Sequence, residues 1–263
     1  MTSVRPGPRE PRGEYGIDGG FGAIAALAAM GAGGLELLAR ALTYAGGGSL
    51  APAALELLGG LLLLQVVASY LYSTRRGKFV AWARWLTGLH LRGDERVLDT
   101  GCGRGAVLGI VAGLVPTGRA IGLDLWRSAD QTGNTVEATR RNLRVEGVSD
   151  RCDLATGDMM AMPFPDATFD LVVSSLAIHN ISGADQRLVA VDEAVRVLKP
   201  GGFLLIADLM RVGAYTEHLR ASGMEEVMEH RPGWRFWFGV LGLATGLVTA
   251  TKTGGGAPPA ARR

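Results

Sequence analysis

The pattern of apolar positions divides the chain into two parts. Residues 19–35 carry no charge, the apolar character continues to about Ala45, and residues 57–74 form a second uncharged run. Each run is about long enough to cross a bilayer as a helix. A glycine-rich break at residues 46–49 separates them. Residues 19–74 are therefore predicted to form a transmembrane helical hairpin.

Charged flanks predict the orientation of this hairpin. The flanking positive charges are Arg5, Arg9, Arg12, Arg75, Arg76 and Lys78, and the connecting loop has none. Since positive flanks stay on the cytoplasmic side, we expect a multi-pass membrane protein with both ends in the cytoplasm. Ala25, Ala29 and Gly33 repeat at a spacing that permits close helix packing. Two alternatives remain: a cleaved signal peptide, or soluble helices that cap the following domain or form a dimer.

A third helix is predicted from Lys78 to Leu91, where Phe79, Trp82 and Trp85 recur at helical spacing. Tryptophans at this junction suit a lipid-water interface. Packing of the helix against the edge of the following domain explains the same pattern, and the sequence does not choose between the two.

Beyond residue 95 the apolar pattern alternates between strands and helices. The predicted strands lie near 96–99, 119–123, 152–157, 169–174, 203–208, 225–230 and 247–252. The predicted helices lie near 105–114, 131–147, 184–198 and 212–222. Such alternation indicates an α/β fold with a parallel sheet, helices on both faces and a ligand at the carboxyl ends of the strands.

A glycine loop joins the first strand to the first helix of this domain. In RVLDTGCGRGAVL, residues 96–108, glycines stand at 101, 103 and 105. Glycine permits backbone turns that a side chain blocks, and lets a ligand lie directly against a helix N-terminus. Dinucleotide-binding folds use a similar loop, so this motif alone does not identify the ligand.

Further motifs follow the strands. Asp99 ends the first strand, Asp124 ends the second at a distance suited to a ribose acid, and Asp158 with Met159 follows the third. The fourth strand runs through Ser175 into LAIHN, and LKPGG precedes the fifth.

In this order, these motifs resemble the class I S-adenosylmethionine-dependent methyltransferases, over about residues 78–253. The resemblance implies a Rossmann-like, seven-stranded, mostly parallel sheet with an antiparallel finish, and S-adenosyl-L-methionine as cofactor. MPFPDATFDLVVSSLAIHNI and RVLKPGG look most like the quinone-ring C-methyltransferases. Those enzymes commonly carry an arginine where this chain has His179, so the substrate does not follow from the resemblance.

The resemblance also implies a set of cofactor-binding residues. They are Asp99, Gly101, Cys102, Gly103, Gly105, Asp124, Leu125, Asp158, Met159 and Ser175. Asp99 and the glycine backbone are expected at the methionine moiety, Asp124 at the ribose, and Asp158 with Met159 at the adenine. The alternative for each acid is a strand-end carboxylate that caps the next helix.

Methyl transfer is an in-line displacement that depends on positioning and a dry pocket, and it needs no metal. An acceptor that must lose a proton requires a base, and His179 is the histidine beside the expected methyl position. Asn180 is expected to orient substrate or water. The alternative is that His179 only closes the pocket.

Composition narrows the possible partners. The net charge is +2 with scattered basic residues, which does not favour a nucleic-acid substrate. Cys102 and Cys152 cannot form a disulfide framework, and neither has the neighbours of a zinc site.

We therefore expect a membrane-anchored methyltransferase, with its catalytic domain at residues 75–253, that acts on a small molecule or a lipid. A non-catalytic cofactor-binding membrane module and a soluble enzyme dimerised through its N-terminal helices are the alternatives. Residues 1–18 and 254–263 are expected to be disordered. Residues 234–246 carry three aromatic side chains, which fit a lid, a surface that dips into the bilayer or a packed loop.

Overall fold

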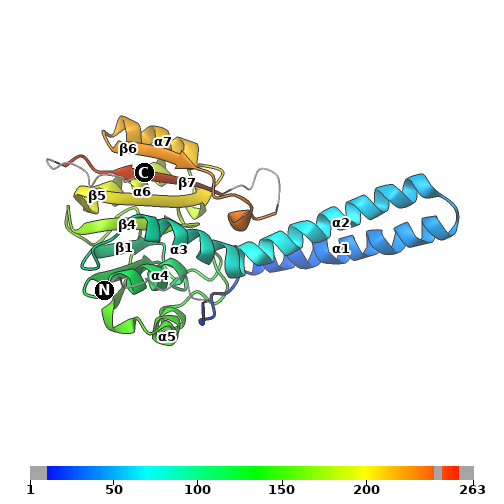
Figure 1. Cartoon of the computed structure of the whole chain (residues 1–263), viewed down its shortest axis with the longest axis horizontal. Coiled ribbons are helices and arrows are strands. Elements are labelled where there is room, and N and C mark those ends of the chain that lie inside the picture. Colours follow the sequence, from blue (N-terminus) through cyan, green and yellow to red (C-terminus); the bar gives the residue numbers. More distant parts are fainter. Residues whose placement is uncertain (1–10, 240–244, 255–263) are drawn as a thin grey trace, which may run out of the picture.

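Within residues 11–239 and 245–254, which the computed structural model describes, one seven-stranded sheet has the order β3-β2-β1-β4-β5-β7-β6 (Figure 1). Its strands are β1 Arg96–Thr100, β2 Arg119–Asp124, β3 Cys152–Thr156, β4 Phe169–Ser175, β5 Leu198–Leu209, β6 Glu225–His230 and β7 Thr245–Thr251. The pairs among β1 to β5 are parallel, and β7 runs antiparallel to both β5 and β6. The predicted strands and the Rossmann-like topology are confirmed, except that β5 begins at Leu198, where it pairs with Phe169, so the predicted turn before it is part of the strand.

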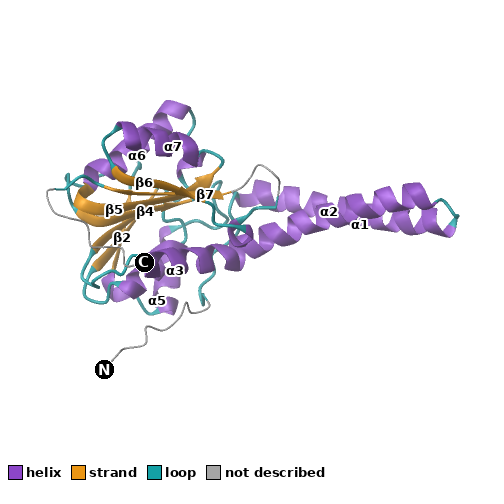
Figure 2. Ribbon diagram, turned by 45° about the horizontal axis from the view of Figure 1, so that its top comes forward, coloured by secondary structure: helices purple, strands orange, loops and turns teal. Residues whose placement is uncertain are grey.

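Helices cover both faces of the sheet (Figure 2). They are α3 Lys78–Gly88, α4 Ala106–Leu114, α5 Val136–Glu146, α6 Ala184–Val197 and α7 Val212–Ala221. Side chains from α3, α4 and α5 share one core cluster with the sheet, and those from α6 and α7 share the other. The central strands are apolar throughout because both of their faces are buried.

Helix α5 begins later than predicted. We expected a helix near 131–147, but α5 starts at Val136. The hydroxyl of Thr135 caps this helix by accepting a hydrogen bond from the Ala138 backbone N–H, at 3.1 Å. The preceding residues are held instead by contacts with the N-terminal segment, where Gly19 donates to the Asp130 carbonyl and Thr132 to the Ile17 carbonyl.

The N-terminal part of the chain forms a long helical hairpin that projects from the α/β domain (Figures 1 and 2). Its helices are α1 Gly20–Gly46 and α2 Leu50–Tyr72, and both are long and apolar enough to cross a membrane. A π-helical turn, η1 Ser73–Gly77, continues α2 directly into α3. The hairpin and the α/β domain are therefore joined by one continuous helical path.

The two hairpin helices meet along a glycine contact. A Cβ atom on Gly60 would lie 2.8 Å from the Gly34 carbonyl oxygen, so only glycine permits this approach. The predicted small-residue face is therefore wrong: Gly34 is buried, whereas Ala25 and Ala29 are exposed. Small residues at the true contact allow the same close backbone packing.

The expectation of disorder over residues 1–18 is wrong for residues 12–18. The Arg12 backbone N–H and the Tyr15 hydroxyl both donate to the Glu146 carboxylate, at 2.7 and 2.9 Å. The side chain of Asn142 bonds to the Glu14 backbone, and the Tyr15 ring packs edge-on against Phe79. Polar groups on α5 thus satisfy this backbone. Residues 1–10 and 255–263 lie outside the described part of the chain.

Residues 234–238 pack against the base of the hairpin. They include the short helix η4 Trp234–Phe236, and Phe236 and Phe238 are buried in the core beside Trp85 and Tyr70. None of the described residues between 234 and 246 lines the cavity beside the glycine loop. The lid hypothesis is therefore not supported for the described residues, and residues 240–244 lie outside them.

Candidate functional site

A cavity of about 310 Å³ lies at the carboxyl ends of the parallel strands. Most of the residues expected at a cofactor line it: Asp99, Gly101, Cys102, Gly103, Asp124, Leu125, Asp158, Met159 and Ser175. Asn180 lines it as well, whereas Gly105 and His179 do not. The topology therefore brings together side chains that are up to about 80 residues apart in the sequence, because parallel strands end at a common edge.

Asp99 is buried in this cavity, at the carboxyl end of β1. Among the described residues, neither of its carboxylate oxygens has a hydrogen-bond partner. Burial, with a contribution from the charge of Asp124, raises the pKa of Asp99 to about 8. A buried carboxylate without a partner is costly, so this position is suited to a ligand that brings a positively charged donor.

The glycine loop lies directly against its neighbours. Gly101 has φ +73°, and a Cβ atom there would overlap the side chain of Ala177. Gly103 has φ +50°, and a Cβ atom there would lie 2.5 Å from the amide oxygen of Gln131. Glycine is therefore required both for the backbone angle and for the close approach. Gly105, with φ +81°, is the N-cap of α4 and acts in the turn rather than in the cavity.

Asp124 fixes the shape of the glycine loop. Its Oδ2 atom accepts from the Gly103 backbone N–H at 2.8 Å. Its Oδ1 atom accepts from the Trp126 backbone N–H at 2.6 Å and from the Asn134 side chain at 3.1 Å. Because a carboxylate has about four acceptor positions, these bonds leave room for one further donor. Asp124 thus joins the loops that follow β1 and β2.

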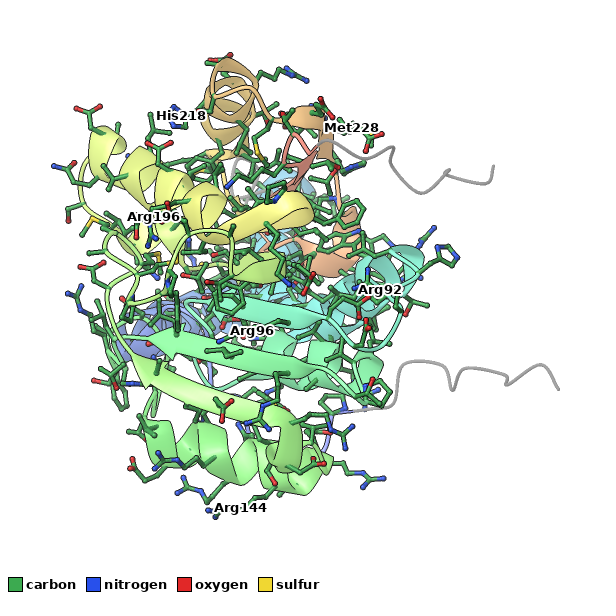
Figure 3. All side chains as sticks on the ribbon, turned by 90° about the vertical axis from the view of Figure 1, so that its left-hand side faces the viewer. Arg92, Arg96, Arg144, Arg196, His218 and Met228 are labelled. Atoms are coloured by element: carbon green, nitrogen blue, oxygen red, sulfur yellow. The ribbon has the colours of Figure 1, made fainter. Side chains whose placement is uncertain are left out.

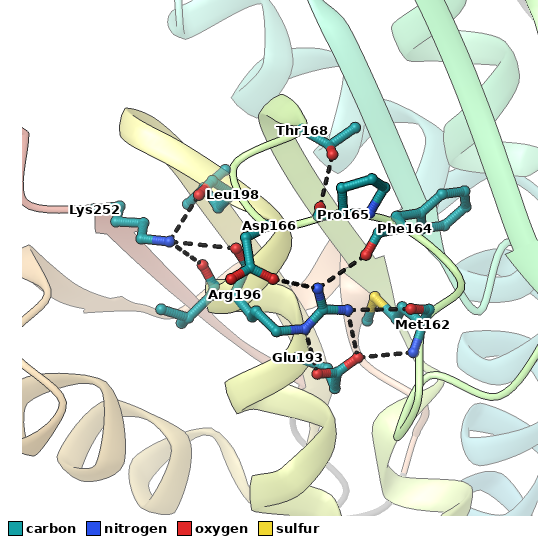
Figure 4. Close-up of polar contacts among 10 residues, drawn as sticks. Met162, Phe164, Pro165, Asp166, Thr168, Glu193, Arg196, Leu198 and Lys252 are labelled. Atoms are coloured by element: carbon teal, nitrogen blue, oxygen red, sulfur yellow. Dashed lines mark hydrogen bonds and ion pairs between the residues drawn. The ribbon is translucent and has the colours of Figure 1, made fainter.

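Hydrogen bonds from α6 hold the loop after β3 (Figure 4). This loop carries Asp158, whose Oδ1 atom accepts from the Met160 backbone N–H at 2.9 Å. The Arg196 guanidinium donates to the Met162 and Phe164 carbonyls and to the carboxylates of Glu193 and Asp166. Arg196 thereby fixes the segment that places Asp158 and Met159 in the cavity.

One wall of the cavity belongs to the base of the hairpin. Lys78 is 4% exposed, and its ammonium group lies 2.9 Å from both carboxylate oxygens of Asp18. Asp18 also accepts from the side chains of Thr74 and Gln131, and the Gln131 amide oxygen accepts from the Arg104 backbone N–H. The hairpin base is therefore bonded to the glycine loop through two side chains.

The contribution of Asp18 and Lys78 to the cavity was not predicted from the sequence. Asp18 directly precedes the first uncharged run, and Lys78 is the last of the positive charges that follow the second. Opposite charges at the two ends of a predicted hairpin are a signal that they meet at its base.

Helix α3 packs on the α/β domain, which decides between the two interpretations of its sequence. Trp82 has no exposed surface, and its indole N–H donates to the hydroxyl of Ser175 at 2.8 Å. Leu86 is equally buried. The interfacial interpretation is therefore wrong for Trp82, which helps to position the end of β4 instead.

His179 is bonded to a buried acid beside the cavity. Its Nδ1 atom lies 2.5 Å from Oδ1 of Asp208, and the imidazole is 24% exposed. Asp208 has no exposed surface and also accepts from the Leu209 backbone N–H and the Tyr215 hydroxyl. Burial and the charge of Asp208 raise the pKa of Tyr215, so this phenol remains a donor. Sequence analysis missed Asp208, although it ends an apolar strand as Asp99 and Asp124 do.

Comparison with known proteins gives partial matches to the α/β domain. Residues 98–206 match the family model described as Methyltransferase domain. The demethylmenaquinone methyltransferase of Symbiobacterium thermophilum is 33% identical over 46% of this chain and 47% of its own length. The sterol 4-C-methyltransferase strm-1 of Caenorhabditis elegans is 32% identical over 48% and 35%. The ubiquinone/menaquinone biosynthesis C-methyltransferase UbiE of Roseobacter denitrificans is 32% identical over 46% and 45%.

The chain thus spans about half or less of the length of these curated relatives. Among solved structures, the cyclase SpnF aligns with a TM-score of 0.55 and 21% identity, over 66% of this chain and 82% of its own. A SAM-dependent methyltransferase from Aquifex aeolicus aligns with a TM-score of 0.50 and 20% identity, over 65% and 88%. At these identities the structural likeness shows the fold alone.

Proposed function

We propose that this protein is a membrane-anchored methyltransferase that acts on a small lipophilic acceptor, because its α/β domain matches the methyltransferase family model and resembles the class I S-adenosylmethionine-dependent methyltransferases. One observation carries the proposal. Asp99 is a buried carboxylate with no hydrogen-bond partner among residues 11–239 and 245–254, and it lies beside a glycine loop in a cavity at the carboxyl edge of the sheet.

The residues of this cavity fit the cofactor. The unpaired Asp99 carboxylate suits the positively charged amino group of its methionine moiety. Gly101 and Gly103 leave bare backbone beside it. Asp124 has acceptor capacity left for a ribose hydroxyl, and Asp158 with Met159 supplies a polar and an apolar contact for the adenine.

When bound, the cofactor supplies a methyl group on a positively charged sulfur. The chain then has to hold both reactants in line and exclude water. Apolar side chains contribute to the cavity wall, among them Leu123, Leu176 and Ile181. Asn180 lines the same cavity, and its amide can orient the acceptor.

His179 is proposed as the base for an acceptor that must lose a proton. Because Nδ1 is bonded to the Asp208 carboxylate, the neutral imidazole carries its proton there and keeps a lone pair on Nε2. Asp208 is then a positioning residue. It does not line the cavity, and its proposed role is to fix the tautomer and orientation of His179.

The exposed surface of the hairpin supports anchoring in a bilayer. Large apolar side chains point outward along both helices, among them Phe21, Leu35, Leu42, Leu50, Leu55, Leu58 and Leu62. The uncharged run 57–74 is about 18 residues long, or about 27 Å as a helix, close to the thickness of a hydrocarbon core. Near the far end of the hairpin, Arg40 pairs with Glu56 at 2.7 Å.

Charge asymmetry supports an orientation with the α/β domain in the cytoplasm. Arg75, Arg76 and Lys78 lie at the base of the hairpin, and its connecting loop carries no positive charge. Glu36, Arg40 and Glu56 then lie toward the opposite interface, where a charge costs less than at the bilayer centre.

The printed names of the relatives support a lipophilic acceptor. They include quinone and sterol C-methyltransferases. An anchor that holds the active site at the membrane raises the effective concentration of an acceptor dissolved there. A quinone precursor or another membrane lipid is therefore the proposed class of acceptor.

A labelling experiment tests this function. Membranes containing the full chain are incubated with cofactor labelled at its methyl group, and lipids, water-soluble molecules and protein are then separated. The proposal predicts label in the lipid extract with the wild type, and its loss with Asp99→Ala. Cofactor that binds but is never consumed would favour the non-catalytic module. Label confined to water-soluble molecules, with the chain recovered as a soluble dimer, would favour the soluble enzyme.

A further inference from the structure

A stacked aromatic pair, half-buried Tyr72 and exposed Trp234, lies at the base of the hairpin. The rings of Tyr72 and Trp234 stack with their centroids 5.2 Å apart and an interplanar angle of 25°. Trp234 is 59% exposed, and the Arg235 guanidinium lies 4.8 Å from the centroid of its ring. On the other helix, Phe21 in the first turn of α1 is 71% exposed. Phe21 of α1 and Trp234 of η4 are thus exposed at the same end of the hairpin, and Tyr72 of α2 is half-buried against the Trp234 ring.

Several contacts fix this pair in place. The hydroxyls of Ser69 and Ser73 both donate to the Trp237 carbonyl, at 2.9 and 2.6 Å. Gly77 lies so close to the Arg235 carbonyl that a Cβ atom would overlap it. The rings of Phe238 and Tyr70 meet edge-on at 5.0 Å. These contacts therefore hold the segment that carries Trp234 against the junction of α2 and α3.

Burial within this segment alternates sharply. Phe236 and Phe238 are 1% and 3% exposed, so they supply the packing that holds the segment. The Trp234 side chain, in contrast, is mainly exposed. A loop that only packs on the domain needs no large exposed indole, because exposing apolar area to water gives no stabilisation.

The order of side chains along α2 is that of a membrane boundary. The uncharged run ends at Thr74, Tyr72 lies in the last turn before it, and Arg75 follows at once on the exposed surface. Arg235, over the Trp234 ring, is exposed as well. Aromatic rings concentrate at lipid-water interfaces, and basic side chains beyond them meet anionic headgroups.

We propose that Tyr72, Trp234, Arg75 and Arg235 form a collar that lies among the headgroups of an anionic leaflet. The collar sets the height of the α/β domain above the bilayer, and this inference rests on the proposed membrane anchoring. Lys78, which lines the cofactor cavity, follows Tyr72 by six residues on a continuous helical path, a rise of about 9 Å. The collar thus keeps the cavity within reach of an acceptor at the membrane surface.

Fluorescence quenching tests the collar in the full chain. The protein is reconstituted into vesicles of an equal mixture of phosphatidylcholine and phosphatidylglycerol, with bromine either near the ester linkage or near the ends of the acyl chains. The component lost in Trp234→Phe is the emission of Trp234. We expect bromine near the ester linkage to quench this component more strongly than bromine at the chain ends.

A charge-matched pair of variants tests the basic residues. Arg75→Gln/Arg235→Gln is expected to weaken the quenching of Trp234 in the anionic vesicles. Arg92→Gln/Arg144→Gln removes the same charge from the end of the domain that faces away from the hairpin, and is expected to leave it unchanged (Figure 3). Equal loss in both double variants, or in neither, would overturn the role of the collar arginines.

A separate readout distinguishes failure of the collar from failure of the anchor. A cysteine introduced by Ser49→Cys at the hairpin tip is treated with a membrane-impermeant maleimide, with the unmodified chain as reference. Protection until detergent is added supports the anchor. A protected tip with no quenching of Trp234 overturns the collar alone, and a tip that reacts without detergent overturns both.

Discussion

The Nδ1 atom of His179 lies 2.5 Å from the Oδ1 atom of Asp208, which is fully buried at the end of β5. The Tyr215 hydroxyl donates to the other carboxylate oxygen at 3.0 Å, so three elements meet at one acid. This contact turns the imidazole toward β5, while its neighbour Asn180 lines the cavity. The contact fixes the orientation of the His179 ring, and the proposal that this ring acts as a base rests on it.

Asp208→Asn is expected to lower kcat by about 10²-fold or more, because the amide no longer favours the Nδ1–H tautomer of His179. Cofactor affinity and KM are expected to stay within a few-fold of the wild type, and the pH profile of kcat is expected to change. Steady-state kinetics and a cofactor titration measure these quantities. Tyr215→Phe removes only the hydrogen bond from the tyrosine hydroxyl to Asp208. It serves as the matched control, with a smaller expected loss of kcat.

His179→Gln tests the same role at the histidine itself. This side chain is 24% exposed, so we expect its replacement to affect folding less than a change at buried Asp208. A kcat unchanged in both His179→Gln and Asp208→Asn, or one that falls only as cofactor binding falls, contradicts the assignment.

Asp99 is expected to make stability depend on pH. Burial raises its pKa from 3.8 to about 8, so between these values the folded protein holds a proton that the unfolded chain releases. The free energy of unfolding of the ligand-free protein therefore falls as pH rises from about 4 to about 8. Urea unfolding across this range is expected to show a weaker decline in Asp99→Asn. The same decline in this variant and in the exposed control Asp94→Asn contradicts the prediction.

Arg196→Lys is expected to loosen the loop after β3. A lysine has no planar fork and cannot bond to two carbonyls and two carboxylates at once. We expect a loss of about 1–3 kcal/mol in stability and weaker cofactor binding, measured by thermal unfolding and calorimetry. Arg144→Lys, at an exposed position of α5, is the control. Unchanged cofactor affinity in Arg196→Lys would show that the loop keeps its shape without the guanidinium.

Much of the fold could be predicted because its determinants are local. The apolar runs of β1 to β5 and the glycines at 101, 103 and 105 signal strands and a tight loop within a few residues. The resemblance to the methyltransferases implied Asp99, Asp124 and Asp158 as cofactor contacts, and their convergence follows from the topology because parallel strands end at one edge.

The features that were missed depend on long-range contacts. Asp18 and Lys78 become part of the cavity only when the hairpin closes at its base. Tyr15 is ordered by Glu146, which lies more than a hundred residues away in the sequence. Polar residues near the N-terminus carry the same composition whether they bind α5 or remain in solvent, so composition alone predicted disorder there.

A calorimetric titration with S-adenosylmethionine shows whether the cofactor binds against the glycine loop. Gly101 and Gly147 share a φ of +73°, but a Cβ atom overlaps Ala177 at the first and has no neighbour within 4 Å at the second. Gly147→Ala therefore carries only the backbone strain, about 1 kcal/mol, and Gly101→Ala carries the strain and the overlap. We expect one cofactor site per chain in the wild type and in Gly147→Ala. In Gly101→Ala we expect binding to be weakened at least about tenfold, a loss of about 1.4 kcal/mol. No heat of binding to the folded wild type, or equal affinity in all three proteins, would contradict it.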